Sequence, residues 1–220
     1  MIKAQLGQKA PLLPVSDWVQ GGPVNFDLLS GRVVLVAVFQ LNCPGCFLYS
    51  LSQAVDLYRR YFDQGLSVLG VATAFEDFDK NNLDNLIRLI ENGDVVGETQ
   101  RMLGQQGKLI DGRLPYRIPF PVAMDRLRKR QADVSHDEIA AFINGRIPNF
   151  DQQPETDQQK IRLQVQQYLQ SLAYHAETFE LFDLKGTPSH ILVDKQGLLR
   201  ACAFGGYPDL EALVLGLLQE

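Results

Sequence analysis

The sequence has few of the residues that build metal sites and covalent frameworks. Its 220 residues include three cysteines, three histidines and one tryptophan. Three cysteines are too few for the disulfide framework of a small secreted domain. The sequence has no second Cys-x-x-Cys, and no two histidines among His136, His175 and His190 have the spacing of a ligand pair. Because a structural zinc site usually needs four ligands, no metal site is expected.

Long apolar runs and long basic runs are also absent. No apolar run approaches the length that crosses a bilayer, and the first residues lack the apolar segment of a signal peptide. Acidic residues outnumber basic ones by 26 to 21, which gives a net charge of −5. The short basic stretch 126–130 is interpreted as a solvated face rather than a phosphate or anion patch. We therefore expect a cytoplasmic protein in a reducing compartment, with no membrane or nucleic-acid partner.

The most informative segment that is present is Cys43-Pro44-Gly45-Cys46. It follows the unbroken apolar run 33–39 and opens an amphipathic stretch that ends at Gly65. A run of β-branched residues is typical of a buried strand, so the cysteines are predicted at a strand-to-helix turn. Pro44 fits the first helical position, which puts Cys43 at the N-cap and Cys46 one turn into the helix on the same side.

This position gives the two cysteines different predicted roles. The N–H groups and partial positive charge of a helix start favour thiolate over thiol at Cys43. Cys43 is therefore the predicted nucleophile and Cys46 the resolving thiol of a redox-active Cys43–Cys46 disulfide. The motif is also compatible with a structural disulfide, with half a zinc site or with chance. Cys202, in an apparent core strand, is predicted to be a buried and inert thiol.

Hydrophobic periodicity predicts an alternation of strands and helices. The strand–helix–strand–helix order after residue 33 indicates that the first strands of the sheet are parallel. We expect one domain, 1–220, with a helical insertion at 126–182 that contains an amphipathic helix of about five turns. The predicted strands are 33–39, 67–73, 120–124, 189–193 and 198–203, and the predicted helices outside the insertion are 44–63, 83–90 and 210–218. The helix in the insertion is predicted from an apolar stripe at helical spacing, formed by Ile161, Val165, Tyr168, Leu169 and Leu172.

Four segments together resemble a known fold. They are the stretch from Gly7-Gln8-Lys9-Ala10-Pro11 to residues 24–32, the Cys-x-x-Cys with its helix, residues 120–125, and residues 186–197, which read GTPSHILVDKQG. In this order they resemble the thioredoxin fold. More narrowly, they resemble the redoxin branch shared by peroxiredoxin-like (AhpC/TSA-like) proteins and the TlpA/ResA-type thiol–disulfide oxidoreductases.

The resemblance implies an α/β fold of three layers, α/β/α, with a mixed central sheet and the helical insertion before the cis-proline strand. It also implies that Pro188 is cis and faces the Cys-x-x-Cys. Thr187 would then turn its backbone N–H and C=O toward a substrate strand, so Thr187 and Pro188 are the predicted substrate-binding residues. The predicted neighbours of the dithiol are Asn42, Pro44, Gly45 and Tyr49.

Several positions depart from the patterns of these families. Asn42 replaces the usual tryptophan of thioredoxins, and Ala37 replaces their buried acid. Tyr49 matches the position of a glutamate in ResA-like members, and Gln40 that of a threonine in peroxiredoxins. Neither familiar carboxylate base for the second cysteine is therefore present. A water, Tyr49 or Glu76 are the substitutes that the sequence leaves open.

The sequence favours an enzyme, a thiol–disulfide oxidoreductase that acts through a mixed disulfide on Cys43. Its partners would be a protein or small-molecule disulfide and an external dithiol reductant, with no cofactor beyond the Cys43–Cys46 pair. A thiol peroxidase with antioxidant activity, or a binding and regulatory module whose dithiol is a redox switch, are the alternatives. His190 faces either the core or the active site, and a homodimer is left open.

Overall fold

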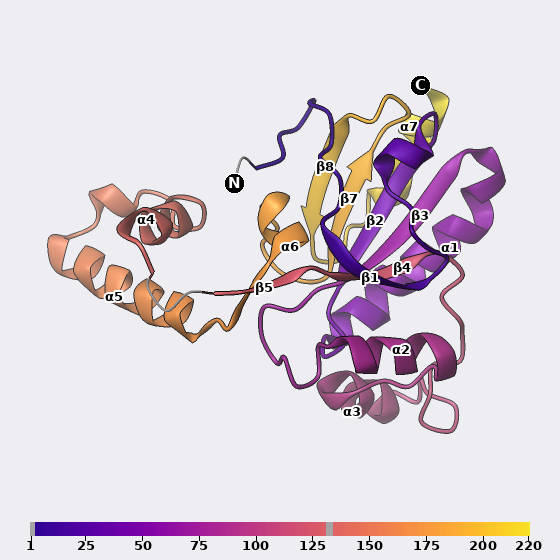
Figure 1. Cartoon of the computed structure of the whole chain (residues 1–220), viewed down its shortest axis with the longest axis horizontal. Helices are drawn as coiled ribbons and strands as arrows, with labels where there is room; N and C mark the ends of the chain where they lie inside the picture. The colour runs from indigo at the N-terminus through magenta and orange to yellow at the C-terminus, as the bar shows by residue number, and fades with distance from the viewer. Residues whose placement is uncertain (1–2, 131–133) are drawn as a thin grey trace. The chain divides into compact units, whose positions relative to one another are not determined.

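The computed structural model describes residues 3–130 and 134–220 of the chain. The chain forms two compact units. The larger comprises Met1–Leu127 and Ala176–Glu220, and the smaller comprises Arg128–His175. The larger unit contains the cysteines and is an α/β structure built on one sheet (Figure 1).

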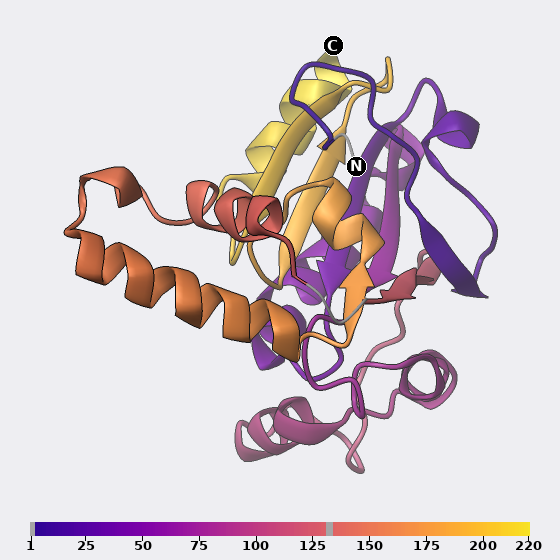
Figure 2. The ribbon, with the colours of Figure 1, turned by 60° about the vertical axis from the view of Figure 1, so that its left-hand side comes forward.

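The sheet of the larger unit is mixed, with strand order β1-β4-β3-β2-β7-β8. β2 pairs in parallel with β3, which pairs in parallel with β4, whereas β1, β7 and β8 are antiparallel to their neighbours. β2 lies beside β7 and β8 although it comes from a distant part of the chain (Figures 1 and 2). The strands are β1 (Val15–Gln20), β2 (Val33–Phe39), β3 (Leu66–Ala72), β4 (Val122–Asp125), β7 (Ser189–Val193) and β8 (Leu199–Phe204).

The central strand β2 is buried over its whole length because side chains cover both faces of the sheet. Alternate residues of a strand point to opposite faces. Val33, Leu35, Ala37 and Phe39 accordingly belong to one apolar cluster, while Val34, Val36 and Val38 belong to another. This two-sided burial explains why the sequence of β2 is continuously apolar rather than alternating.

Helices complete the two outer layers. One face is covered by α1 (Leu51–Tyr61) and α7 (Leu210–Gln219), whose buried leucines join the first cluster. The other face is covered by α6 (Glu177–Leu181) and the 3-10 turn η1 (Phe26–Leu29), which contribute to the second cluster. The helices α2 (Leu83–Asn92) and α3 (Gly97–Gln105) complete the unit, and both add leucines to the first cluster.

The helix ends follow the local signals in the sequence. Gly65 and Gly93 have φ of 104° and 79° and end their helices in the left-handed conformation that glycine adopts most easily. The side chain of Asn82 accepts a hydrogen bond from the Asn85 backbone N–H and caps the start of α2. The predicted elements at 33–39, 83–90, 189–193 and 210–218 are confirmed within two residues at each end.

The smaller unit contains two helices that cover each other, α4 (His136–Asn144) and α5 (Glu155–Ser171) (Figure 2). Val165 and Leu169 of the predicted stripe on α5 are buried against Ile139 and Ile143 of α4, whereas Tyr168 is exposed. The chain enters and leaves through β5 (Leu127–Lys129) and β6 (Tyr174–Ala176), which pair as a two-stranded sheet. Among the helices of the described residues, none is long and apolar enough to cross a membrane.

A buried carboxylate joins two strands and a helix in the larger unit. Asp125, at the end of β4, is fully buried. Its side chain accepts hydrogen bonds from Thr73 Oγ1 at 2.7 Å and from the Thr178 backbone N–H at 2.8 Å. Burial raises the pKa of Asp125 to about 6, although these hydrogen bonds act in the opposite direction.

This raised pKa predicts a pH-dependent stability. The folded state holds the Asp125 proton more tightly than the unfolded state, whose pKa is about 3.9. The stabilisation is therefore complete below about pH 4 and is lost as the pH rises through about 6. The expected loss is at most about 3 kcal/mol of unfolding free energy. Asp125→Asn should lack this fall between about pH 4 and 7 in urea unfolding series.

The exposed residue Asp27 provides the control for removal of one negative charge. Asp27→Asn should retain the wild-type fall in unfolding free energy over the same pH range. Equal pH slopes for Asp125→Asn and the wild-type protein would contradict the assignment.

Candidate active site

The two cysteines of the motif lie at the start of the helix that follows β2. Pro44 is the first helical residue, as predicted, and Cys43 precedes it. The turn Cys46–Ser50, labelled η2, is π-helical and continues into α1. The Cys46 backbone N–H lies 3.3 Å from Cys43 Sγ and donates to it. This donor near the sulfur favours a negative charge on Cys43.

The cis-proline loop faces the dithiol. The Thr187–Pro188 bond is cis, as predicted. Cys43 Sγ lies 3.6 Å from the Thr187 carbonyl oxygen, to which the thiol donates. A Cβ at Gly45 would lie 3.8 Å from Pro188 Cδ, so the glycine and the proline face each other across a short gap. The structure therefore brings the predicted residues of both segments together.

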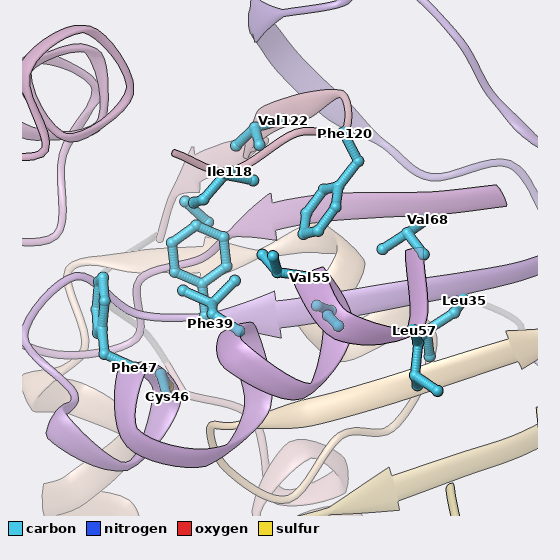
Figure 3. Packing of buried hydrophobic residues seen from close by; sticks show 14 of the residues in the cluster. Leu35, Phe39, Cys46, Phe47, Val55, Leu57, Val68, Ile118, Phe120 and Val122 are labelled. Carbon is cyan, nitrogen blue, oxygen red and sulfur yellow. The ribbon is translucent and has the colours of Figure 1, made fainter. Parts of the chain in front are cut away.

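The environments of the two sulfurs differ sharply. Cys43 is half-buried, and its pKa is lowered to about 7, mainly by the Cys46 thiol and then by the Thr187 side chain and nearby backbone N–H groups. Cys46 is fully buried among apolar side chains, including Phe47 and Phe39 (Figure 3). Burial, followed by the neighbouring Cys43, raises the pKa of Cys46 well above its usual range. The lowered pKa of Cys43 was predicted, but its leading cause is Cys46 rather than the helix start.

Gln40 joins the end of β2 to the cis-proline loop. Its side chain is buried, and Gln40 Oε1 accepts a hydrogen bond of 2.9 Å from Thr187 Oγ1. The Thr187 hydroxyl and the Gln40 backbone N–H also lower the pKa of Cys46. Thr187 thus contacts the dithiol through its side chain as well as through its carbonyl group.

Asn42 braces the active-site turn rather than facing outward. Its backbone N–H donates to Asn81 Oδ1 at 2.9 Å, and its Nδ2 donates to Asp77 Oδ2 at 2.6 Å. Its Oδ1 accepts from the Glu98 backbone N–H at 2.7 Å. Gly97 has φ of +55°, and a Cβ there would collide with Asn42 Oδ1. The position that is tryptophan in thioredoxins therefore connects the motif to α3.

His190 is buried in the core, on the same layer as Cys46. It lies on β7 directly opposite Ala37, and its Nε2 is 2.9 Å from Ser50 Oγ. Burial lowers the pKa of His190 to about 4, so the imidazole is neutral near pH 7. The sequence left the environment of His190 undecided, and Ser50 was not identified at all. A serine four residues after Cys46 on an otherwise apolar helix face was the signal for it.

The two side chains that the sequence offered as bases are both exposed. Tyr49 is 62% exposed, and Glu76 is exposed in the loop after β3. Cys46 is completely buried. Neither side chain is therefore in the buried layer that surrounds the Cys46 sulfur.

The prediction of a buried Cys202 is wrong. Cys202 lies on the edge strand β8, and its side chain is exposed. It lines a shallow cavity of about 250 Å³ together with Leu184, Lys185 and Phe204. Partial desolvation, followed by Asp183, raises the pKa of Cys202 to about 11. The sequence pattern misled because the side chains of β8 beyond Leu199 alternate between exposed and partly buried.

The described residues contain no cluster of three or more histidine, cysteine or acidic side chains that could hold a metal ion. The groups that act on the two sulfurs are a hydroxyl, backbone groups and a second thiol. Such groups can shift the thiol–thiolate equilibrium of each cysteine separately. The arrangement suits thiol–disulfide exchange, in which one thiol attacks and the other follows.

No family model and no curated protein matches the chain, but solved structures do. One is a thioredoxin-like superfamily protein with 23% identity and a TM-score of 0.58, covering 96% of this chain and 97% of its own. Another is a thiol-disulfide isomerase from Corynebacterium glutamicum with 24% identity and a TM-score of 0.59, covering 97% of each chain. The fold is therefore thioredoxin-like, with the mixed central sheet that the sequence predicted.

The site predicts an unusually reactive Cys43. Its carbamidomethylation by iodoacetamide, followed by peptide mass spectrometry, should show a pH midpoint near its pKa of about 7. Cys46→Ala should raise this midpoint, because it removes the largest cause of the lowered pKa. Cys202→Ala should leave it unchanged. A wild-type midpoint at or above the ordinary value of about 8.5 would contradict the assignment.

The brace around Asn42 predicts a specific cost at Gly97. Gly97→Ala should reduce the unfolding free energy by about 2–3 kcal/mol, because it adds a collision with Asn42 to the strain of a positive φ. Gly107 has φ of +65° and open space around its Cβ position, so Gly107→Ala reports strain alone. Urea unfolding of both variants gives the difference. Equal losses of unfolding free energy in the two variants would show that the collision with Asn42 does not destabilise the protein.

Proposed function

We propose that this protein is a thiol–disulfide oxidoreductase that uses Cys43 as nucleophile and Cys46 as resolving thiol. The observation that supports it best is the contrast between the two sulfurs. Cys43 is accessible, has a lowered pKa and lies against the cis-proline loop, while Cys46 is buried with a raised pKa. Disulfide exchange needs a nucleophile that is partly ionised at neutral pH and a second thiol that stays protonated until the mixed disulfide has formed.

The proposed reaction has two exchange steps. The Cys43 thiolate attacks one sulfur of a substrate disulfide, forms a mixed disulfide and releases the other sulfur as a thiolate. Cys46 then loses its proton and attacks Cys43 Sγ, which releases the second substrate thiolate and leaves the Cys43–Cys46 disulfide. An external dithiol returns two electrons and two protons to the pair. No further cofactor enters this cycle.

Substrate recognition is proposed at the cis-proline loop. The Thr187 carbonyl already lies beside Cys43 Sγ, and the Thr187 backbone would pair with an extended substrate segment. Tyr49 and Phe204 are 62% and 58% exposed, and a Cβ at Gly186 of the same loop would collide with the Phe204 ring. These aromatic groups offer apolar contact area to a protein or small-molecule disulfide.

Two further points support exchange over peroxidase chemistry. The C. glutamicum structure is described as a thiol-disulfide isomerase, although its 24% identity relates it to this chain by fold alone. Gln40 stands where peroxiredoxins have threonine, and its side-chain oxygen, Oε1, accepts a hydrogen bond from the Thr187 hydroxyl. We therefore place the chain nearer to the TlpA/ResA-type oxidoreductases than to the AhpC/TSA-type peroxidases.

The proposal predicts distinct outcomes for the three cysteines. In a reduction assay with insulin and dithiothreitol, Cys43→Ser should lower the rate to the uncatalysed background. Cys46→Ser should accumulate a mixed disulfide on Cys43, seen as a mass increase that dithiothreitol reverses. Cys202→Ser is the matched control and should keep the wild-type rate. Wild-type activity in Cys43→Ser would overturn the proposal.

A further inference from the structure

The buried position of Cys46 raises a question about its proton. Cys46 must become a thiolate to attack the mixed disulfide, yet its residue is completely buried. The groups that lower its pKa are the Gln40 backbone N–H and the Thr187 side chain. The Gln40 N–H has no lone pair to offer, and the Thr187 hydroxyl donates its hydrogen to Gln40 Oε1, which is not a base. A proton acceptor within the core is therefore needed.

The strand next to β2 places a histidine in that layer. His190 on β7 is directly opposite Ala37 on β2 in the antiparallel register, so both side chains point to the same face of the sheet. Ala37 belongs to the cluster that contains Cys46. The small side chain of Ala37 leaves room beside it, and His190 projects into this layer from the neighbouring strand.

Ser50 lies on the helix of the dithiol and faces this histidine. Ser50 is fully buried, and its Oγ is 2.9 Å from His190 Nε2. It follows Cys46 by four residues in the π-helical turn, in which the Leu51 N–H bonds to the Cys46 carbonyl oxygen. Residues four apart lie on the same side of such a helix, one turn along. His190 Nδ1 is buried and has no hydrogen-bond partner in the described part of the chain.

We propose that Ser50 and His190 form a proton relay for Cys46. Cys46 passes its proton to Ser50 Oγ, and the Ser50 hydroxyl proton moves to His190 Nε2, in the tautomer whose hydrogen is on Nδ1. The Cys46 thiolate attacks Cys43 Sγ in the mixed disulfide, and the substrate sulfur leaves as a thiolate. The leaving thiolate takes a proton from solvent, and the imidazolium returns its proton along the same path when the external dithiol reduces the Cys43–Cys46 disulfide and releases Cys46 as a thiolate. This inference rests on the proposed function.

The surroundings of His190 suit this role. Its cross-strand neighbours, Ala37 and Ala203, are apolar, and the facing helix presents the Ser50 hydroxyl. Desolvation alone accounts for the lowered pKa of His190, so no charged group among the described residues contributes. The imidazole is therefore neutral near pH 7, with a nitrogen lone pair available to the Ser50 hydroxyl. The negative charge that forms on Cys46 stabilises the imidazolium, as opposite charges in a buried pair do.

Dithionitrobenzoate separates the two exchange steps. In a Cys202→Ala background, Cys43 attacks the reagent and releases one thionitrobenzoate, and Cys46 then releases the second. His190→Gln keeps a hydrogen-bonding side chain without a titrating group. It should leave the first release unchanged and slow the second at least about tenfold. Ser50→Ala should have the same effect, and Ser52→Ala, an exposed serine on the same helix, should have none.

The pH profile distinguishes a relay from a structural role. The second release should be nearly constant above about pH 6 in the parent protein, because the proton moves inside the pair. In both variants it should rise continuously up to about pH 9, as hydroxide takes the proton instead.

Parent-like second release in either variant, with a normal first release, would overturn the relay. Should His190→Gln fail to fold, Ser50→Ala alone decides. A parent protein without any second release would instead contradict the proposed function.

Discussion

The burial of Cys46 is the constraint on which the rest of the site depends. A sulfur inside the core keeps its proton, and a sulfur one turn earlier at the surface loses its proton readily. The two environments differ because β2 ends beneath the helix start, so the first turn crosses from solvent to core within three residues. Thr187 contacts both sulfurs, and it is held by Gln40 at the end of the same strand. The pKa values of the two cysteines therefore depend on β2, the helix start and the cis-proline loop together.

Local patterns were sufficient for most of the fold. Val33–Phe39 is continuously apolar because both faces of β2 are covered, and this burial needs no knowledge of the partners. Gly65 and Gly93 mark helix ends through their own backbone preferences. The cis bond before Pro188 followed from family resemblance alone, since a Thr-Pro pair by itself indicates only the start of a strand.

The remaining features depend on pairings between distant residues. Cys202 was misplaced because exposure on an edge strand depends on what covers the strand, and an apolar neighbourhood in sequence does not show this. The contact of His190 with Ser50 depends on the register of β7 against β2. The hydrogen bonds of Asn42 with Asp77, Asn81 and Glu98 join three segments that no periodicity relates. The sequence was thus sufficient to predict the Cys-x-x-Cys motif but not the hydrogen bonds that hold it in place.

The pairing of β5 with β6 has a consequence for how this chain folds. The two paired strands hold the ends of the smaller unit together. The two parts of the chain that form the larger unit are therefore joined by the short distance between these strands. The entropy lost on closing a loop grows with the length of free chain, and this ladder removes most of that length. The smaller unit also has an apolar cluster of its own. Its helices can therefore open and reform as a separate cooperative unit, without loss of the sheet that contains the dithiol.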